Sequence, residues 1–311
     1  MSELSRKQLY IGASMALLAA IIWAGNFLVS KGVADIIPPV SLAFYRWFTA
    51  SIFIIPFGAG TLKKEVPVIR KNLRLLLFAA LTGVAVFNTF IYIAGHYTSA
   101  INMALIGTTS SPVFVIIISA IFLNVKIRLI RVFGLLFCIA GILVLLSKGS
   151  WETLTAFRFA VGDLWVLASA LSFAIYNILV KRKPAGLSSV NFLKAIFWLG
   201  TLMILPFFIA ERSMMPPIQW STDLLLIILY LGLGTSVTSF LLWNAAIHKL
   251  GSVRTALFGN LIPIFASIEA IWILGESLTI FHFIAGGCVV IGLILANSRK
   301  ANQSQPTIKQ S

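Results

Sequence analysis

Ionisable side chains inside long apolar stretches are the first candidates for chemistry in this chain, because a charge at membrane depth is costly and is seldom kept without a role. Arg46, Lys194 and Glu269 are such residues. Arg46 can hold a substrate carboxylate through two parallel hydrogen bonds, unless it bonds helix-end carbonyls or extends to the surface. Glu269 is a candidate proton-coupling site or anchor for a substrate amine, or else a hydrated residue near the outer surface. Lys194 fits a side chain that snorkels to the surface.

The second group of candidates is polar or aromatic. Asn88, Tyr92 and His96 follow one another at intervals of four residues and therefore share one face of a helix. Such a stripe lines a cavity or joins helices by hydrogen bonds, and a histidine can also respond to pH. The other candidates for substrate binding, all at expected membrane depth, are Trp23, Asn26, Thr109, Tyr176, Trp243 and Asn260. The aromatic members of this group can equally serve packing alone.

Two prolines inside predicted helices are candidate hinges. Pro112 and Pro263 each deprive a carbonyl one turn earlier of its backbone donor. Membrane helices also tolerate such kinks without a mechanical role. Their matching places in the two halves of the chain favour a shared function as hinges.

The residues needed for enzymatic or metal chemistry do not form a recognisable pattern. Cys138 and Cys288 stand in separate apolar runs and read as small hydrophobic residues. Three scattered histidines provide no metal-ligand spacing, and there is neither a pair of carboxylates nor a nucleophile with its base. We therefore expect a protein that is not an enzyme and that uses no cofactor or metal.

The composition indicates a membrane protein. Apolar residues make up 59% and charged residues 11% of the 311, and the mean hydropathy is +0.99. A soluble domain has roughly 45–50% apolar and about 25% charged residues. The net charge of +15 is distributed in short clusters between apolar runs, which disfavours nucleic acid as a partner. The expected partners are a small-molecule substrate and membrane lipids, with protons as the candidate coupling ion.

The apolar runs predict ten membrane-spanning helices that position these residues, since about 20 apolar residues cross a bilayer. We expect them near residues 9–32, 39–59, 73–95, 99–123, 130–147, 161–181, 189–210, 223–246, 253–274 and 279–297. The first run is too long for a cleavable signal peptide. Of the 24 Lys and Arg residues, 18 fall on the side of the N-terminus and four on the other. This bias predicts both termini in the cytoplasm. The polar tail at 298–311 is expected to be disordered.

The two halves of the chain align with each other. With a shift of 151 residues Gly83 falls on Gly234 and Pro112 on Pro263, and near the start a shift of 150 puts Trp23 on Phe173. Each half, 9–147 and 161–297, holds five predicted spans. Because five is odd, the second half must cross the membrane in the opposite sense. Inverted repeats of this kind are common in secondary transporters, whose sites lie between the halves.

Several short motifs, in this order and spacing, resemble the EamA family of the drug/metabolite transporter superfamily. They are Trp23 to Phe27 with Lys31, Phe44 to Arg46, Tyr97 to Ala100, Ser111-Pro112, Trp243 to Ala246, Pro263, Leu274 to Glu276, Gly286 and Gly292. The resemblance implies an all-α integral membrane protein with ten helices, a central cavity, and export of amino acids or related metabolites. One departure is Leu123-Asn124-Val125, where the family often repeats Leu-Gly-Glu, which leaves Glu276 without a counterpart.

These observations together predict a secondary transporter in the inner (cytoplasmic) membrane. We expect it to move a small organic metabolite, such as an amino acid, by alternating access and in the outward direction. The few fixed charges within the spans disfavour multiply charged phosphates. The alternatives are an uncoupled channel or facilitator of the same fold and a membrane-embedded enzyme.

Overall fold

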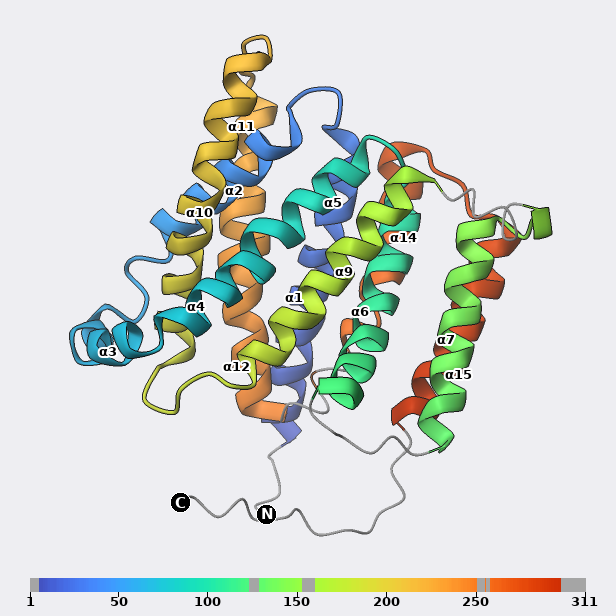
Figure 1. Cartoon of the computed structure of the whole chain (residues 1–311), viewed down its shortest axis with the longest axis horizontal. Coiled ribbons are helices and arrows are strands. Elements are labelled where there is room, and N and C mark those ends of the chain that lie inside the picture. The colour runs from blue at the N-terminus through green and yellow to red at the C-terminus, as the bar shows by residue number, and fades with distance from the viewer. Residues whose placement is uncertain (1–5, 123–128, 153–159, 251–254, 256–257, 298–311) are drawn as a thin grey trace.

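The computed structural model describes residues 6–122, 129–152, 160–250, 255 and 258–297, and the regular structure in these ranges is helical (Figure 1). The elements of the first half are α1 (Arg6–Gly32), α2 (Pro39–Phe53), α3 (Ala59–Lys71), α4 (Leu73–Ala80), η1 (Leu81–Val86), α5 (Phe87–Gly95), α6 (Ala100–Phe122) and α7 (Leu129–Ser147). Those of the second half are α9 (Val161–Val180), α10 (Ser189–Met214), α11 (Thr222–Leu229), η2 (Tyr230–Thr238), α12 (Ser239–Leu250), α14 (Ile262–Leu274) and α15 (Ile280–Asn297). The segments η1 and η2 are π-helical.

Six helical runs in the described ranges are long and apolar enough to cross a membrane. They are Gln8–Gly32, Leu73–Gly95, Ala100–Ser119, Val161–Val180, Ser189–Met214 and Thr222–Leu250. Shorter apolar helices cover Val132–Val144, Ile262–Leu274 and Ile280–Gly292. The chain is therefore a multi-pass helical membrane protein. The predicted tail at 298–311 lies outside the described residues.

Four predicted spans have different bounds in the structure, among them the seventh, which continues through Met214, beyond the expected residue 210. The second, expected over 39–59, ends at Phe53, because a turn leads through Pro56 to Gly58, which has a φ of 68°. The eighth continues through Leu250, beyond the expected residue 246. Within the ninth, expected over 253–274, residues 260 and 261 form a turn between the helical residues 258–259 and α14, which begins at Ile262. Turns thus shorten the second span and interrupt the ninth.

The helices pack in an arrangement in which each half contacts the other extensively. The helix α1 packs against α12 and α14, and α9 packs against α5 and α6. The helix α2 packs against α10, and α7 against α15. Figure 1 shows α7 and α15 side by side at one end of the molecule and α2, α10 and α11 at the other.

Residues about 150 positions apart meet where α2 crosses α10. The side-chain oxygens of Ser51 and Thr201 lie 3.2 Å apart, and the rings of Trp47 and Phe197 have centroids separated by 4.8 Å. The crossing of α7 with α15 is similar, with Cys138 placing its sulfur 3.9 Å from a carbonyl oxygen 151 residues away.

Three helices begin at a carboxylate that another part of the chain supplies. Glu211 on α10 accepts bonds from the backbone N–H groups of Val40 and Ser41 at 3.0 and 2.6 Å, at the start of α2. Glu65 on α3 accepts the Ser188 backbone N–H at 2.9 Å, at the start of α10. At the start of α6, Glu276 accepts the backbone N–H groups of residues 100 and 101 at 2.7 and 3.0 Å. Each carboxylate satisfies N–H groups that a helix cannot satisfy itself and lies at the positive end of the helix dipole.

The π-helical segments bring neighbouring helices close. Gly83 in η1 leaves room for the ring of Tyr176, and Gly232 in η2 leaves room for Thr49 and the Arg46 carbonyl. Carbonyls freed in π-helical turns need other donors. The Ser172 hydroxyl donates to the carbonyl of residue 82 at 2.8 Å. A π-helical turn therefore stands in each half and packs against helices of the other half, η1 against α9 and α10 and η2 against α2.

Candidate functional site

Arg46 lies at the centre of a buried polar cluster drawn from four helical elements. Its Nη1 donates to Asn26 Oδ1 on α1 at 2.5 Å, and to Asn88 Oδ1 and the Tyr92 hydroxyl on α5, both at 2.8 Å. Its Nε donates to Ser236 Oγ on η2 at 2.9 Å. Only 3% of Arg46 is exposed. Four of the sequence candidates thus come together, and both halves of the chain contribute to the cluster.

The partners of Arg46 are held in place by their own bonds. The Tyr92 hydroxyl donates to Asn26 Oδ1 at 3.1 Å, and the Ser236 hydroxyl donates to the Leu231 carbonyl at 3.0 Å. The Arg46 guanidinium also lies 4.9 Å from the centroid of the Trp47 ring, within the range of a cation–π contact. The arrangement is preorganised, because each group has a defined orientation before any ligand binds.

Aromatic side chains lie next to this cluster on α1 and α12. The Trp23 indole N–H donates to the Thr235 carbonyl of η2 at 2.9 Å. Its ring lies 5.0 Å from Trp243 and 5.4 Å from Phe240, centroid to centroid. Trp23 and Trp243 therefore belong to one aromatic group. Trp23 lies on α1, three residues before Asn26. Such a group suits the apolar part of a small organic ligand.

Glu269 approaches the same region from α14. One of its oxygens, Oε2, is buried and has no hydrogen-bond partner in the described part of the chain. Tyr230 lies within electrostatic range of both Glu269 and Arg46, and its hydroxyl donates to the Ile22 carbonyl of α1 at 2.7 Å. The hydroxyl rests against Gly25, where a larger residue would displace it. Tyr230 thus stands near both a carboxylate and a guanidinium.

His96 lies at the surface end of the stripe that the sequence predicted. The helix α5 ends at Gly95, and His96 takes part in a surface pocket of about 250 Å³ together with Asp35 and Met215. Tyr92 and Asn88 are buried, one and two turns earlier. The third member of the stripe lies at the end of α5, beside this surface pocket.

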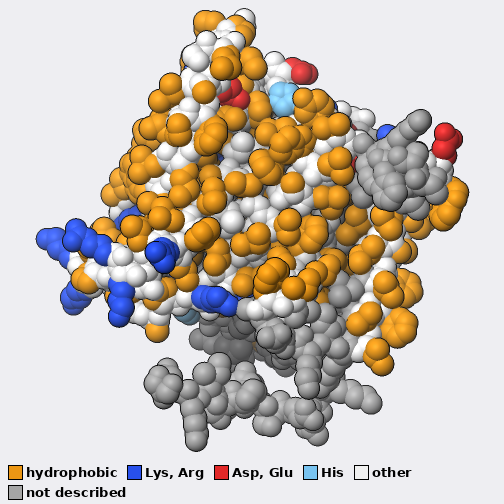
Figure 2. All heavy atoms as spheres, viewed as in Figure 1, with side chains coloured by type: hydrophobic (Ala, Val, Ile, Leu, Met, Phe, Trp, Pro, Cys, Tyr) orange, Lys and Arg blue, Asp and Glu red, His pale blue; other side chains and the backbone are white. Residues whose placement is uncertain are grey.

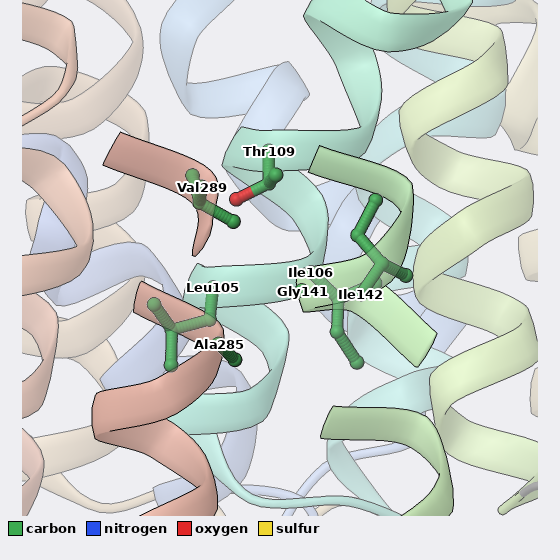
Figure 3. Close-up of a pocket in the computed structure, with 7 residues that line it drawn as sticks. All are labelled: Leu105, Ile106, Thr109, Gly141, Ile142, Ala285 and Val289. Atoms are coloured by element: carbon green, nitrogen blue, oxygen red, sulfur yellow. The ribbon is translucent and has the colours of Figure 1, made fainter. Parts of the chain in front are cut away.

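Three further candidates also lie away from Arg46. Thr109 on α6 lines an apolar pocket of about 10 Å³ towards α7 and α15, which has room for about one water (Figure 3). Tyr176 packs its ring against Gly83 and stacks on Phe173 at 5.6 Å. Asn260 is exposed in the turn before α14. This turn lies between the helical residues 258–259 and α14, so Asn260 stands at an interruption of the ninth predicted span.

The two prolines occupy different places in their helices. Pro112 stands inside α6, whereas Pro263 is the second residue of α14. A proline in the first turn removes no helical hydrogen bond, since those N–H groups have no intrahelical acceptor. Of the two candidate hinges, Pro112 alone lies within a continuous helix. At Pro263 the break lies in the turn that precedes α14.

Sequence reasoning missed several residues of this region. Tyr230 was not among the candidates, although it lies in η2 beside the cluster. Lys194 does not extend to solvent: only 7% of it is exposed, and its Nζ donates to the Ile55 carbonyl just after α2. The small residues of Tyr230 to Thr238 were the available signal, since glycine and hydroxyl side chains accompany close helix packing and π-helical turns.

The fold and this buried site define a class, namely multi-pass helical membrane proteins with a polar and aromatic centre. The model of the EamA-like transporter family matches residues 10–147 and again residues 160–298. This chain belongs to the EamA-like transporter family, which confirms the resemblance seen in the sequence. Its relatives are transporters, and the match extends over nearly the whole chain.

Individual relatives agree with this assignment. An uncharacterised transporter of Archaeoglobus fulgidus is 26% identical, with 91% of this chain and 96% of the relative covered. A probable amino-acid metabolite efflux pump of Escherichia coli is 24% identical, with 90% and 93% covered. A solved crystal structure shares the fold, with a TM-score of 0.58 at 18% identity, over 92% of this chain and 96% of the other.

Proposed function

We propose that this protein is a secondary transporter that moves a small organic metabolite out of the cell across the inner (cytoplasmic) membrane by alternating access. The observation that carries the proposal is the Arg46 cluster, which joins α1, α2, α5 and η2 in a buried position. A polar site between two halves, closed on both sides, is what a carrier needs in an occluded state. The efflux pump of Escherichia coli supports the outward direction and an amino acid or related compound as the substrate.

Ten spans in two inverted five-helix repeats, 9–147 and 161–297, are part of this proposal. The match of the family model to two successive stretches supports it. So do the reciprocal packing of α1 and α9 and the contact of Ser51 with Thr201. An inverted pair places similar elements near each membrane surface, so that the same movement opens one side while it closes the other.

We further propose that both termini are cytoplasmic. Figure 2 shows Lys and Arg side chains gathered at one end of the molecule, and α3 contributes Lys63, Lys64, Arg70 and Lys71 there. Asp, Glu and His side chains are visible towards the opposite end in the same view. Lys and Arg accumulate on the cytoplasmic side of membrane proteins, which supports this orientation.

Glu269 is our candidate for coupling transport to protons, and Pro112 and Pro263 are candidate hinges. The unpartnered buried oxygen of Glu269 supports the first role, since a carboxyl group without a fixed partner can bind and release a proton. The prolines stand in the fourth and ninth predicted spans, at or near breaks in hydrogen bonding. His96, Thr109, Tyr176 and Asn260 remain proposed substrate contacts for states of the cycle in which the cavity is open.

Reconstitution into liposomes tests the function. Uptake of radiolabelled amino acids and nucleobases is measured under an imposed pH gradient, for the wild type, Glu269→Gln and Asp223→Asn. Asp223 is an exposed acid at the start of α11 and controls for the loss of one charge. We expect saturable flux that follows the gradient and weakens only in Glu269→Gln. Saturable flux indifferent to pH would remove Glu269 from coupling, non-saturable flux would indicate a facilitator, and the absence of flux for every compound would refute the proposal.

A further inference from the structure

The charge of Arg46 has no anionic partner in the described ranges. Its four hydrogen-bond acceptors are two amide oxygens and two hydroxyl oxygens, all of them neutral. Among the described residues no carboxylate forms an ion pair with it. A buried guanidinium that is solvated only by neutral groups remains poorly compensated in a medium of low dielectric constant. The site is therefore more stable when an anion is present.

The guanidinium also has unused donor capacity. It carries five N–H bonds in a planar fork, and Nη2 has no acceptor among the residues that the structure describes. At the same time Nη1 has two N–H bonds but three acceptors within 2.8 Å. These bonds are shared, so a carboxylate oxygen can replace one of the three acceptors at Nη1 while its other oxygen engages Nη2.

Tyr92 is the acceptor that can yield most easily. Its hydroxyl already donates to Asn26 Oδ1 at 3.1 Å, and a hydroxyl hydrogen can rotate towards a new acceptor. Ser236 and Asn88 would continue to hold the guanidinium while the Tyr92 hydroxyl donates to the incoming oxygen. A second donor nearby, the indole N–H of Trp47, is buried and without a partner in the described part of the chain. Two donors without acceptors at one place indicate a ligand that supplies oxygen atoms.

Resting on the proposed transport function, we infer that Arg46 is the specificity-determining residue of the site and binds the carboxylate of the transported metabolite. The planar fork selects a carboxylate over a carboxamide, because both oxygens of a carboxylate accept and an amide presents a competing N–H₂ group. The aromatic group of Trp23, Phe240 and Trp243 beside the cluster suits an apolar side chain on the same ligand. Glu269 is available to an amine, so an amino acid and a plain carboxylic acid are distinguishable by experiment.

The test compares ligands that differ by one group. Leucine and phenylalanine are assayed beside their amides, which lack the carboxylate, and beside 4-methylpentanoate and phenylpropionate, which lack the amine. Binding to the purified protein is followed by thermal stabilisation, and transport is followed by counterflow in liposomes. Each assay is made with the wild type, Arg46→Lys and Lys194→Gln. Arg46→Lys retains the charge but lacks the fork. Lys194→Gln removes another buried cation, one that is bonded to a backbone carbonyl away from the cluster.

We expect the wild type to prefer at least one acid to its amide by about tenfold or more, as one bidentate pair provides. Arg46→Lys should abolish this preference, and Lys194→Gln should keep it. The inference would be overturned if the wild type bound amides as well as acids, or if it transported only compounds without a carboxylate. In the second case the transport function would still stand. Arg46-dependent binding of acids without counterflow would sustain the inference and refute the transport function. Preference for the amino acid over the deaminated acid, or its absence, identifies which kind of carboxylate the site takes.

Discussion

Replacement of Glu65 by glutamine removes the charge that caps the start of α10, and we expect it to lower the free energy of unfolding. Glu65 Oε2 accepts three hydrogen bonds, from the backbone N–H and the hydroxyl of Ser188, both at 2.9 Å, and from Asn191 Nδ2 at 3.1 Å. These residues are more than 120 positions away from Glu65, so the bonds join the two halves of the chain. Glutamine retains the size of the side chain and one acceptor oxygen.

The expected loss is about 2 kcal/mol at neutral pH. Hydrogen bonds to a charged group contribute about 1.5–3 kcal/mol each, and neutral ones contribute about half as much, so three weakened bonds lose about 2 kcal/mol after desolvation is considered. Burial acts to raise the pKa of the Glu65 carboxyl group, but hydrogen bonds from the Ser188 backbone and from the side chains of Asn191, Ser188 and Thr61 outweigh it and lower the pKa below its usual 4.5. The charged form therefore stabilises the fold.

The sign of the pH dependence follows from this shift. A carboxyl group with a lowered folded-state pKa stabilises the protein fully above its unfolded-state pKa, and the contribution is lost as the pH falls through the folded-state pKa. The gap between the wild type and Glu65→Gln should therefore be largest near neutral pH and should shrink below about pH 4.5.

Unfolding by sodium dodecyl sulfate in mild detergent micelles, from about pH 7 down to about pH 3.5, measures this gap. Asp35→Asn is the matched control, because Asp35 is exposed and accepts no hydrogen bond in the described ranges. It should behave as the wild type does. A Glu65→Gln protein as stable as the wild type at neutral pH, or a deficit that persists unchanged in acid, would refute the electrostatic explanation.

Three more predictions concern helix contacts. Glu211→Gln should lower the free energy of unfolding by about 1–2 kcal/mol, as loss of a helix cap does, and an unchanged value would mean that water replaces the carboxylate. Gly95→Val should lower the free energy of unfolding by about 3 kcal/mol or prevent folding, because its Cβ would overlap a backbone carbonyl of α1. The control Gly60→Ala meets no atom and should stabilise the protein slightly. Oxidation of Ser51→Cys/Thr201→Cys, in a background without the native cysteines, should form a disulfide and leave transport intact, since polar contacts hold both ends of α2 against α10. Transport blocked by this disulfide and restored by reduction would show that the two helices separate during the cycle.

The sequence by itself determined the class of the protein and the order of most of its helices. Hydropathy and span length are local properties, because each stretch that crosses the bilayer must itself be apolar enough and long enough, with its backbone hydrogen bonds made within its own helix. The family was recognisable for a related reason, since motifs such as Trp23 to Phe27 keep their spacing along the chain. Arg46 was identifiable because a charge inside an apolar run is conspicuous without any knowledge of its neighbours.

Only the tertiary structure decided which residues stand together. The acceptors of Arg46 lie 20, 42, 46 and 190 residues away, and no local pattern encodes such separations. The same holds for Glu65, whose position between two predicted spans gave no sign that it caps a helix in the other half. His96 lies at the end of α5 beside a surface pocket, and Asn260 lies in a turn that interrupts the ninth predicted span; hydropathy shows neither the helix end nor the turn. Contacts between distant segments depend on how helices cross, and helix crossing is set by small residues, π-helical turns and caps that act only once the chain is folded.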